Sequence, residues 1–502
     1  MTALRDYLLS PVRTHAHRTA LVDGDTTWTY ADLERSARGL AGHLHQLGVR
    51  AGTPVALLLA NRAEYVVADL AIAALGAAKV PLNAMLSLEE QAFIVDDSGA
   101  VVCIVEAGRL DAVARARDLG VDPALVVVDT EDWARAIAHP PLAEEVPVGD
   151  DDVALIMYTG GTTGRPKGVV HTQAGMAANL LSHLIEMELT GEDVLLLTSP
   201  LPHSAGFLLQ AALTKGATTI LESRFDPDAV LDRIERDGVS YLFLVPTMIY
   251  RLLDAAAARP GVDTSSLRTI LYGAAPITPD RLTQGLAAFG PVFVQLYAQS
   301  EAPNFLTRLR RDDHRTDEAG VHLLRSCGQA VVMARVAVVG EDGFACPPGE
   351  VGEVAAISPY TMTGYLGRPE ETAAALRDGW LHTGDLGYLD EQGYLYLVDR
   401  MKDMIITGGL NVYSSEVEQV IARIPGVREV AVAGIPHPDW GEAVVAFVVT
   451  EPGITTDRIE AACRDGLTSY KRPKAVSLVA ALPTTAVGKI DKKALRAGWD
   501  SW

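Results

Sequence analysis

Cysteine is scarce in this sequence. Only four cysteines occur among 502 residues, and no two stand close enough to form a CxxC pair. Because zinc sites and disulfide frameworks need clustered or paired cysteines, neither is indicated, and a reducing compartment such as the cytoplasm fits best. The four are Cys103, Cys327, Cys346 and Cys463.

Long apolar runs are also missing. The most apolar stretch, residues 66–82, is interrupted by Asp69 and Lys79 and is short of the length that crosses a bilayer. The first twenty residues contain arginine and histidine but no apolar segment that ends in a cleavage site, so we expect no signal peptide. We therefore expect no membrane partner.

Positive charge is outweighed by negative charge. The sequence has 43 lysines and arginines against 64 aspartates and glutamates, a formal net charge of -21. Such a protein repels a phosphate backbone, so we expect no nucleic-acid partner. If it handles nucleotides, its cations must gather where the phosphates lie. Four stand in distinctive local sequences: Lys167, Arg400, Lys402 and Lys489.

The length and the pattern of the chain predict an α/β fold. A chain of 502 residues is too long for one compact core, so two or more domains are expected. Helical patterns alternate with short apolar runs such as 55–60 and 100–105, which is typical of largely parallel strands. After an acidic surface connection at 129–152, two predicted strands within 269–276 and 292–302 run into loops. Neighbouring strand ends of this kind predict a site at the carboxyl edge of a sheet.

The pattern changes near Tyr394. A strand and a charged turn precede a helix in which Ser415 and Glu418 are spaced as a capping box. Two strands, a helix and a last strand complete a compact α+β unit. The predicted organisation is a large N-terminal domain of α/β subdomains with mostly parallel sheets (1–398), a hinge (399–403) and a small mobile α+β domain (404–502).

A glycine-rich loop, YTGGTTGRPKG at residues 158–168, stands between an apolar strand and a helical stretch. Its backbone N–H groups and hydroxyls can turn toward phosphate oxygens, with a lysine nearby. It is no Walker A loop, because Gly-Lys-Ser/Thr does not follow at the required spacing. A short glycine motif alone would more often be an ordinary turn, but eleven residues of this type favour phosphate binding.

The loop resembles the signature of the adenylate-forming superfamily, which includes acyl-CoA synthetases, aryl-CoA ligases, luciferases and peptide-synthetase adenylation domains. Gly160 stands where that signature has a serine, Ala298 replaces a glycine, and Ser300 replaces a threonine. Further elements follow in the family's order along essentially the whole chain: TWTYADL near Thr27, PLPHSAGF at 200–207, YGAAP at 272–276, YAQSE at 297–301, WLHTGDLG at 380–387 and PTTAVGKIDKKAL at 483–495.

The resemblance implies a site for ATP and Mg²⁺. Glu301 would carry the metal ion, Ser300 would contact phosphate, and Tyr297 would pack on adenine. Asp385 would accept hydrogen bonds from the ribose hydroxyls, with Arg400 nearby. The implied nucleotide-binding residues are Thr159, Gly160, Gly161, Thr162, Thr163, Gly164, Lys167, Gly273, Ala274, Ala275, Pro276, Tyr297, Ala298, Asp385, Leu397 and Arg400.

The resemblance also implies a catalytic lysine in the small domain. A carboxylate that attacks the α-phosphate of ATP brings two anions together, so a cation must stabilise the charge that develops. Lys489 is implied to supply it, and Lys402 to be the hinge residue when the small domain moves between the half-reactions. The residues implied to contact coenzyme A are Gly408, Gly409, Trp440 and Lys471.

The acid is implied to lie beside PLPHSAGF and YGAAP. His203 would border the pocket as a gate residue that serves position, although a lone histidine in an apolar stretch is more often packed in a core. Small residues in this region favour a bulky aryl acid or a medium to long alkyl acid, and among these we favour aryl or arylpropenoyl acids. The implied pocket residues are His203, Ala205, Gly206, Thr247, Gly273 and Gln299.

We therefore predict a cytoplasmic, ATP-dependent carboxylic acid:CoA ligase that forms an acyl adenylate and works as a monomer or homodimer. Two alternatives use the same scaffold: transfer of the acyl group to a carrier-protein thiol, and activation of nitrite to diazotise an aromatic amine. A nucleotide-binding protein without catalysis is disfavoured because Lys489 and Glu301 are both present.

Overall fold

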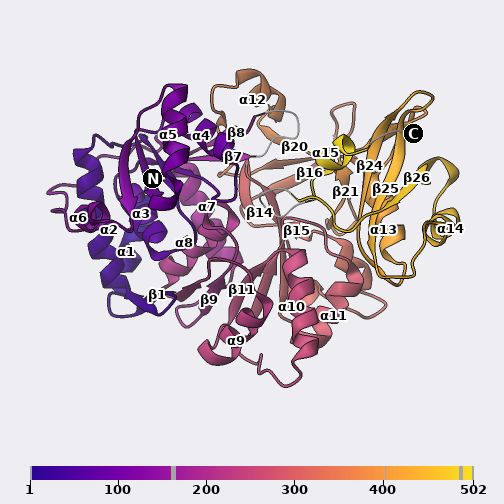
Figure 1. Cartoon of the computed structure of the whole chain (residues 1–502), viewed down its shortest axis with the longest axis horizontal. Coiled ribbons are helices and arrows are strands. Elements are labelled where there is room, and N and C mark those ends of the chain that lie inside the picture. Colours follow the sequence, from indigo (N-terminus) through magenta and orange to yellow (C-terminus); the bar gives the residue numbers. More distant parts are fainter. Residues whose placement is uncertain (1–2, 160–164, 402, 485–489, 500–502) are drawn as a thin grey trace. The chain divides into compact units, whose positions relative to one another are not determined.

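The computed structural model describes residues 3–159, 165–401, 403–484 and 490–499. The chain divides into two compact units, which Figure 1 colours along the sequence. The first is Met1–Val336 with Ala356–Leu381, and the second is Ala337–Ala355 with His382–Trp502. The predicted hinge at 399–403 falls within the second unit, and the boundary at residue 398 stays a prediction.

A nine-stranded sheet dominates the first unit, in the order β15-β14-β13-β12-β11-β9-β10-β1-β2. Strands such as YLFL and TILY are buried throughout because both faces of a parallel sheet are covered. The edges are antiparallel: β2 (Thr26–Thr29), β14 (Ala302–Leu309) and β15 (Gln329–Ala330). The parallel strands are β1 (Thr19–Asp23), β10 (Thr218–Leu221), β9 (Val194–Leu197), β11 (Tyr241–Leu244), β12 (Thr269–Tyr272) and β13 (Phe293–Gln299).

A seven-stranded sheet forms the rest of the first unit's framework, in the order β18-β8-β7-β4-β3-β5-β6. Its first two strands, β18 (Gly364–Tyr365) and β8 (Lys167–Thr172), run antiparallel to their neighbours. The parallel strands are β7 (Val153–Thr159), β4 (Ala78–Pro81), β3 (Pro54–Leu58), β5 (Val102–Glu106) and β6 (Ala124–Val128). The predicted α/β class with mostly parallel sheets is confirmed.

Apolar helices connect the two sheets. The helix α7 (Gln173–Glu186) contacts β7 and β8 of one sheet and β14 of the other. Its neighbour α8 (Gly206–Lys215) and the helix α3 (Ala63–Ala74), which packs against β3 and β4, are buried on nearly every side, as helices that are apolar all round must be. Asp69 of α3 and Lys79 of β4, the two charges that interrupt the most apolar stretch, form an ion pair of 2.7 Å.

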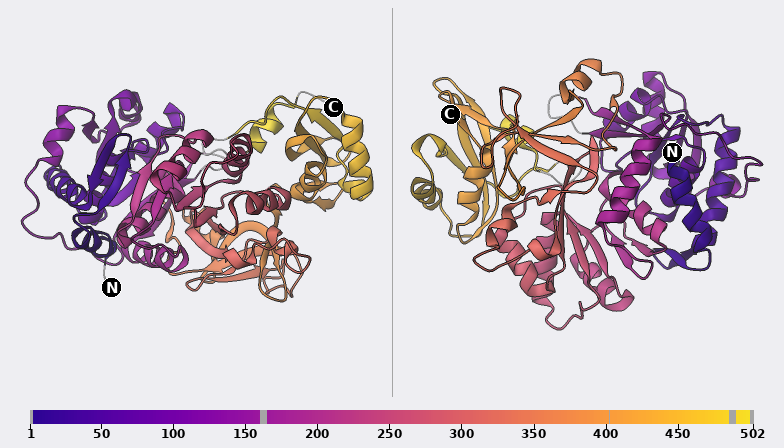
Figure 2. Two further views of the ribbon diagram at one scale, coloured as in Figure 1. Left: turned by 90° about the horizontal axis from the view of Figure 1, so that it is seen from below. Right: turned by 180° about the vertical axis from the view of Figure 1, so that it is seen from behind.

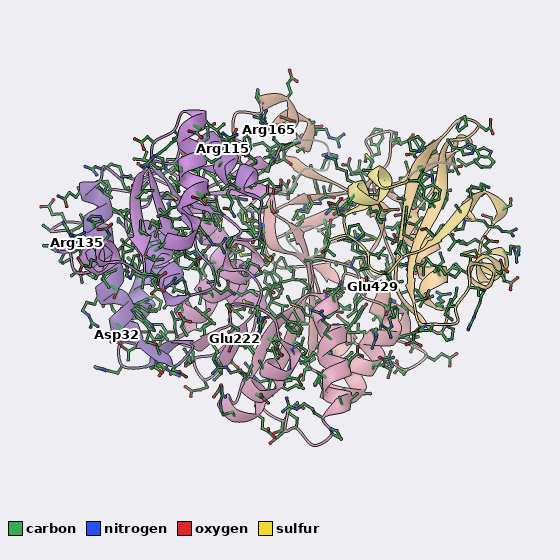
Figure 3. The ribbon with its side chains drawn as sticks, viewed as in Figure 1. Asp32, Arg115, Arg135, Arg165, Glu222 and Glu429 are labelled. Atoms are coloured by element: carbon green, nitrogen blue, oxygen red, sulfur yellow. The ribbon has the colours of Figure 1, made fainter. Side chains whose placement is uncertain are left out.

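The remaining helices of the first unit lie outside this central layer, and α1 among them packs against other helices, α2, α3, α7 and α8. Their outward side chains are charged, as Arg115 and Arg135 show in Figure 3. No helix of the described residues is long and apolar enough to cross a membrane. The remaining helices of the first unit are α1 (Leu4–Thr14), α2 (Tyr30–Gln46), α4 (Leu88–Asp97), α5 (Leu110–Leu119), α6 (Glu131–Ile137), α9 (Pro227–Asp237), α10 (Pro246–Ala258), α11 (Pro279–Phe289) and α12 (Pro369–Ala375).

The second unit contains an α+β layer as predicted. Alternate residues of its long strands face opposite sides: Val432 and Val444 pack toward α13 and α14, whereas Ala433 and Val445 pack toward Leu495 of α15. Figures 1 and 2 show α13 and α14 beside these strands. The elements are β22 (Ile405–Thr407), β23 (Leu410–Val412), α13 (Ser414–Ala422), β24 (Val427–His437), β25 (Gly441–Thr450), α14 (Thr456–Gly466), β26 (Ala475–Leu478) and α15 (Lys492–Ala497).

Five further strands form a separate sheet. It contains β16 (Arg335–Val339), β17 (Gly352–Ile357), β20 (Trp380–Leu389), β19 (Leu376–Arg377) and β21 (Leu395–Arg400), and the last pairs with β20.

Three local predictions are wrong. The glycine-rich loop leads into a strand, β8, which pairs antiparallel with β7, so no helix begins at the loop. The segment 129–152 is not only a connection, because Trp133 and Ala136 anchor the short helix α6 in the core. The capping box does not form: the Ser415 hydroxyl donates to the carbonyl of Val398, and Glu418 accepts the N–H of Val432.

Candidate active site

The predicted site residues of the first unit gather at one edge of the nine-stranded sheet. Strands β9, β11, β12 and β13 are parallel neighbours, so their carboxyl ends meet at the same edge. The segment with His203 follows β9, Thr247 follows β11, Gly273 follows β12, and Tyr297 lies near the end of β13. The predicted meeting of the last two strand ends is confirmed, and the structure adds the first two.

The YGAAP segment packs closely against β13. A Cβ atom added to Gly273 would stand 2.6 Å from the carbonyl oxygen of Leu296, so only glycine permits this approach. Ala274 follows with φ of +68°, a left-handed conformation that is uncommon for alanine. Ala274, Ala275 and Pro276 are exposed, which leaves their surface accessible to a flat ligand.

The segment that carries His203, the predicted gate residue, has an irregular backbone. Residues Leu201–Ala205 form a π-helical turn, a feature that is frequent at functional sites, and His203 within it has non-helical angles. Ala205 and Gly206 are buried behind it at the start of α8. His203 is only half-buried, so it is not simply a packed core histidine.

Asn83, which the sequence did not nominate, fixes the His203 ring. Its Oδ1 accepts the N–H of Met85 at 2.9 Å, so its Nδ2 is the atom that lies 3.1 Å from His203 Nε2. Since an amide nitrogen donates, His203 Nε2 is the acceptor in this hydrogen bond. In the sequence, Asn83 directly follows the most apolar stretch, residues 66–82, which marks the end of a buried segment but not the partner of the side chain.

The phosphate loop joins two strands of the seven-stranded sheet. Thr159 ends β7 and lies opposite Lys167, which begins β8. Gly160, Gly161, Thr162, Thr163 and Gly164 lie outside the described residues. Arg165, labelled in Figure 3, has its guanidinium 5.2 Å from the centre of the Phe93 ring, and the Lys167 ammonium lies 5.1 Å from that of Tyr365.

Glu301 stands at the turn between β13 and β14, held by two neighbours. Its Oε1 accepts the hydroxyl of Tyr365 at 2.7 Å, and its carbonyl accepts the N–H of Met362 at 2.7 Å. The carbonyl of Ser300 lies 2.9 Å from Nε2 of His171, a buried histidine whose pKa burial lowers to about 4. His171 is therefore neutral at physiological pH, and its Nε2–H donates. Sequence reasoning missed Tyr365 and His171.

The other predicted residues of this edge differ in exposure. Tyr297 is buried, Ala298 and Gln299 are half-buried, and Thr247 is exposed at the start of α10. The structure thus brings the predicted adenine and acid-pocket residues to one edge, while their individual roles stay predictions.

In the second unit, two predicted ribose contacts form a pair. Asp385 of β20 lies opposite Arg400 of β21, and Arg400 Nε stands 3.0 Å from Asp385 Oδ1. Asp385 is 4% exposed and half of Arg400 is exposed, so the guanidinium holds a buried carboxylate in place. Leu397 lies on β21 opposite Gly387. Lys402 and Lys489 lie outside the described residues.

The four residues predicted to contact coenzyme A belong to one surface of the second unit. Gly408 and Gly409 form the turn between β22 and β23 with φ of +57° and +79°, which suits glycine in a tight hairpin. The N–H of Gly408 donates to the carbonyl of Trp440 at 2.9 Å. Trp440 stacks on His437, and Lys471, beside β23, is paired with Glu416 at 2.7 Å.

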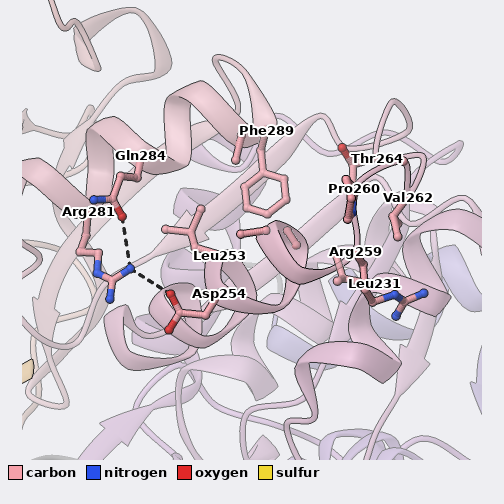
Figure 4. Close-up of a pocket in the computed structure, with 14 residues that line it drawn as sticks. Leu231, Leu253, Asp254, Arg259, Pro260, Val262, Thr264, Arg281, Gln284 and Phe289 are labelled. Atoms are coloured by element: carbon pink, nitrogen blue, oxygen red, sulfur yellow. Dashed lines mark hydrogen bonds and ion pairs between the residues drawn. The ribbon is translucent and has the colours of Figure 1, made fainter. Parts of the chain in front are cut away.

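A cavity of about 410 Å³ between α9, α10 and α11 contains none of these residues. Its lining includes Thr264 and Phe289, which precede β12 and β13, so it lies at the amino edge, opposite the predicted site. Figure 4 shows Arg281 at its rim, bonded to Asp254 and Gln284. Both arginines that line the cavity, Arg281 and Arg259, are paired with carboxylates, so neither offers an uncompensated charge to an anion.

Comparison with known proteins agrees with this arrangement. The model of the AMP-binding enzyme family matches residues 10–366, and that of the AMP-binding enzyme C-terminal domain matches residues 416–489. The chain is 41% identical to a feruloyl-CoA synthase of Amycolatopsis sp over 96% of both chains. It is 38% identical to a medium/long-chain-fatty-acid–CoA ligase of Mycobacterium tuberculosis, over 98% of this chain and 89% of that one.

The solved structures point to the same family. The amide bond synthetase McbA from Marinactinospora thermotolerans is 34% identical and superimposes with a TM-score of 0.88, over 99% of this chain and 100% of that chain. A family model that spans most of the chain, together with relatives of this identity over their full length, confirms the resemblance noted in the sequence. The chain belongs to the AMP-binding enzyme family, whose members form adenylates.

Proposed function

We propose that this protein joins an arylpropenoyl acid of the feruloyl type to coenzyme A with the consumption of ATP. The coarser class, an AMP-forming acid:CoA ligase acting on an aryl or alkyl acid, is confirmed by relatives that align over nearly the whole chain. The observation that supports the proposal is the meeting of four parallel strand ends at one edge, where we expect the adenine and acid contacts.

The proposed acid follows from the small residues at this edge and from the relatives. Ala274, Ala275 and Pro276 are small and exposed, which leaves a flat surface for an aromatic ring. The Cβ positions of Gly206 and Gly273, by contrast, are filled by the carbonyls of Leu201 and Leu296. His203 Nε2 lies 3.1 Å from the amide nitrogen of Asn83, a neutral group, so this contact supplies no fixed cation for a second carboxylate. The feruloyl-CoA synthase is a full-length relative at 41% identity, and its acid is of this class.

In the first half-reaction, one oxygen of the acid attacks the α-phosphorus of ATP, and pyrophosphate leaves. The residues of the loop 159–167 would hold the phosphates, and Asp385 would accept hydrogen bonds from the ribose. Lys489 would stabilise the negative charge that develops on the α-phosphate. Most of the acceleration would come from alignment of the two reactants and from this charge stabilisation.

Mg²⁺ would accompany ATP, and the residues fit it. Among the described residues no group of three or more His, Cys, Asp or Glu side chains could hold a metal ion. A single carboxylate, Glu301, is what Mg²⁺ needs when phosphate oxygens and water complete its octahedron. When bound, the ion would neutralise phosphate charge.

In the second half-reaction, the thiol of coenzyme A attacks the acyl carbon and AMP leaves. We place the thiol against the Gly408–Gly409 turn, with Trp440 and Lys471 at the same surface. Lys402 would be the hinge for the movement that replaces Lys489 by this surface. We propose that the reaction takes place in the cytoplasm. A carrier-protein thiol remains an alternative acceptor, and nitrite an alternative substrate.

The test is pyrophosphate release from Mg-ATP across ferulate, benzoate, octanoate, a dicarboxylic acid and nitrite, each with coenzyme A, a carrier protein or an amine as the acceptor. We expect ferulate with coenzyme A to give the highest kcat/KM and a thioester product. Lys489→Ala should lower pyrophosphate release by about a hundredfold or more, whereas Lys493→Ala, an exposed lysine four positions on, should not.

Each contrary result has a definite meaning. Octanoate as the best acid would replace the aryl proposal by an alkyl acid. An amide formed from an amine without thioester would make the acceptor wrong and leave the adenylate. Release that depends on nitrite and an aromatic amine would overturn both substrate and reaction.

A further inference from the structure

We propose that Tyr365 is a positioning residue that leaves one oxygen of the Glu301 carboxylate for the metal ion and so makes the site prefer Mg²⁺ to Ca²⁺. The inference rests on the proposed function, in which Glu301 is the metal-binding carboxylate. Tyr365 lies outside the motifs that identify the nucleotide site in the sequence.

The hydrogen bond between these two residues joins groups that are both anchored. The Tyr365 hydroxyl donates to Glu301 Oε1 at 2.7 Å. The N–H of Tyr365 donates to the hydroxyl oxygen of Thr372 at 2.9 Å, and the strand β18 that carries it pairs with β8. On the other side, the Glu301 carbonyl is held by the N–H of Met362 at 2.7 Å. The phenol therefore has a set position relative to the carboxylate.

The coordination preferences of the two cations make this contact selective. Ca²⁺ takes six to eight oxygen ligands and accepts a carboxylate through both oxygens, whereas Mg²⁺ demands a near-ideal octahedron in which a carboxylate supplies one oxygen. Oε1 already accepts the Tyr365 hydroxyl, so a bidentate mode would weaken or break that bond. A monodentate mode keeps it. The hydroxyl should thus favour Mg²⁺.

The same ring also contacts the phosphate loop. The Lys167 ammonium lies over the Tyr365 ring, 5.1 Å from its centre. Tyr365 thus touches the loop lysine with its face and the proposed metal carboxylate with its hydroxyl. Tyr365→Phe retains the ring and its contact with Lys167 and removes the hydrogen bond to Glu301 alone, which makes it the appropriate variant.

The experiment measures ATP binding by calorimetry while Mg²⁺ or Ca²⁺ is varied, so the readout does not depend on turnover. We expect Tyr365→Phe to raise the Mg²⁺ concentration for half-maximal ATP binding about tenfold, as suits a lost hydrogen bond to a charged group. The Ca²⁺ midpoint should change by less than about threefold. Thr372→Val, which loosens the Tyr365 backbone, should act in the same direction and more weakly.

Two further variants separate this inference from the function on which it rests. Tyr396→Phe removes a hydroxyl that donates to Asp390 at 3.2 Å in the second unit, and both midpoints should stay unchanged. Glu301→Gln should raise the Mg²⁺ midpoint more than Tyr365→Phe does. Thermal unfolding without nucleotide checks that each variant is folded.

The outcomes are distinct. If Glu301→Gln raises the Mg²⁺ midpoint and Tyr365→Phe and Thr372→Val do not, the positioning role is wrong and the proposed function stands. If Tyr365→Phe raises the Mg²⁺ and Ca²⁺ midpoints by the same factor, the selectivity is overturned. If Glu301→Gln leaves the Mg²⁺ midpoint unchanged, the metal role of Glu301 in the proposed function is wrong, and this inference fails with it.

Discussion

The carboxyl edge of the nine-stranded sheet and the Gly408–Gly409 surface of the second unit are built in opposite ways. At the edge, Gly273 has no space for a Cβ atom, Tyr297 is buried, and Glu301 is bonded on two sides. At the other surface, Trp440 is 39% exposed and the turn consists of two glycines. Adenylate formation needs reactants that are fixed in space, whereas a thiol can be received on a more open surface.

Acid should destabilise the first unit before it affects the second unit. Burial lowers the pKa of His171, His183 and His314 to about 4, and all three belong to the first unit. Below pH 6.5 the unfolded chain takes up protons that the folded chain refuses, so stability is full above pH 6.5 and is lost as the pH falls toward 4. At pH 5 each histidine should cost about 2 kcal/mol of unfolding free energy relative to pH 8.

Calorimetric unfolding between pH 8 and pH 5 measures this loss. His314→Asn should reduce the dependence of the unfolding free energy on pH by about one proton. A Tm that stays constant over this range would contradict the assigned protonation of the three rings.

Gly273 at the edge should be far less replaceable than a glycine with open space around it. Gly273→Ala places a Cβ atom 2.6 Å from the carbonyl of Leu296, so the YGAAP segment must move. We expect kcat/KM for pyrophosphate release to fall about a hundredfold and the unfolding free energy to fall by about 2 kcal/mol. Gly108→Ala, where no atom lies within 4 Å of the new Cβ, is the control. Equal activity of the two variants would remove the distinction.

A substitution at the Gly408–Gly409 surface should slow thioester formation and leave adenylate formation unchanged. Gly409→Ala imposes a left-handed conformation of +79° on alanine, at a cost of about 1 kcal/mol. We expect thioester formation to slow about tenfold while pyrophosphate release in the absence of coenzyme A stays unchanged. Gly453→Ala introduces a similar strain at an open turn of the same unit and should change neither step. A loss of pyrophosphate release in Gly409→Ala would mean that this turn serves the first step.

The smallest effect is expected at the amino-edge cavity. Arg281→Met removes an exposed ion pair with Asp254, and such pairs are worth about 1 kcal/mol or less. Activity should stay within about twofold of the wild type for every acid tested. A selective change in KM for one acid would show that this cavity, and not the carboxyl edge alone, takes part in binding.

Much of the architecture could be predicted from the sequence, because apolar strands and the family's motifs are local signals. The strand at 153–159 and the strand ends at YGAAP and YAQSE were predicted where they occur. The capping box failed because a hydroxyl and a carboxylate found partners elsewhere in the fold: Ser415 bonds to Val398, and Glu418 bonds to Val432.

The missed site residues were beyond the reach of local patterns. Tyr365 is 64 positions from Glu301, and Asn83 is 120 positions from His203. Nothing near either residue in the sequence shows which partner the fold will supply. The sequence also predicts a helical stretch directly after the glycine-rich loop, whereas pairing of KGVVHT with β7 makes it a strand.

The two-residue strand β18 has a consequence for synthesis of the chain. Thr363 donates to the carbonyl of Val170 across 193 positions, and the same segment holds Glu301. Ribosomes add about 5–20 residues per second, so β8 is made many seconds before its partner leaves the exit tunnel. A nascent chain should therefore lack its complete nucleotide site until the segment around Tyr365 has emerged, and ATP should protect the chain from protease only after that length.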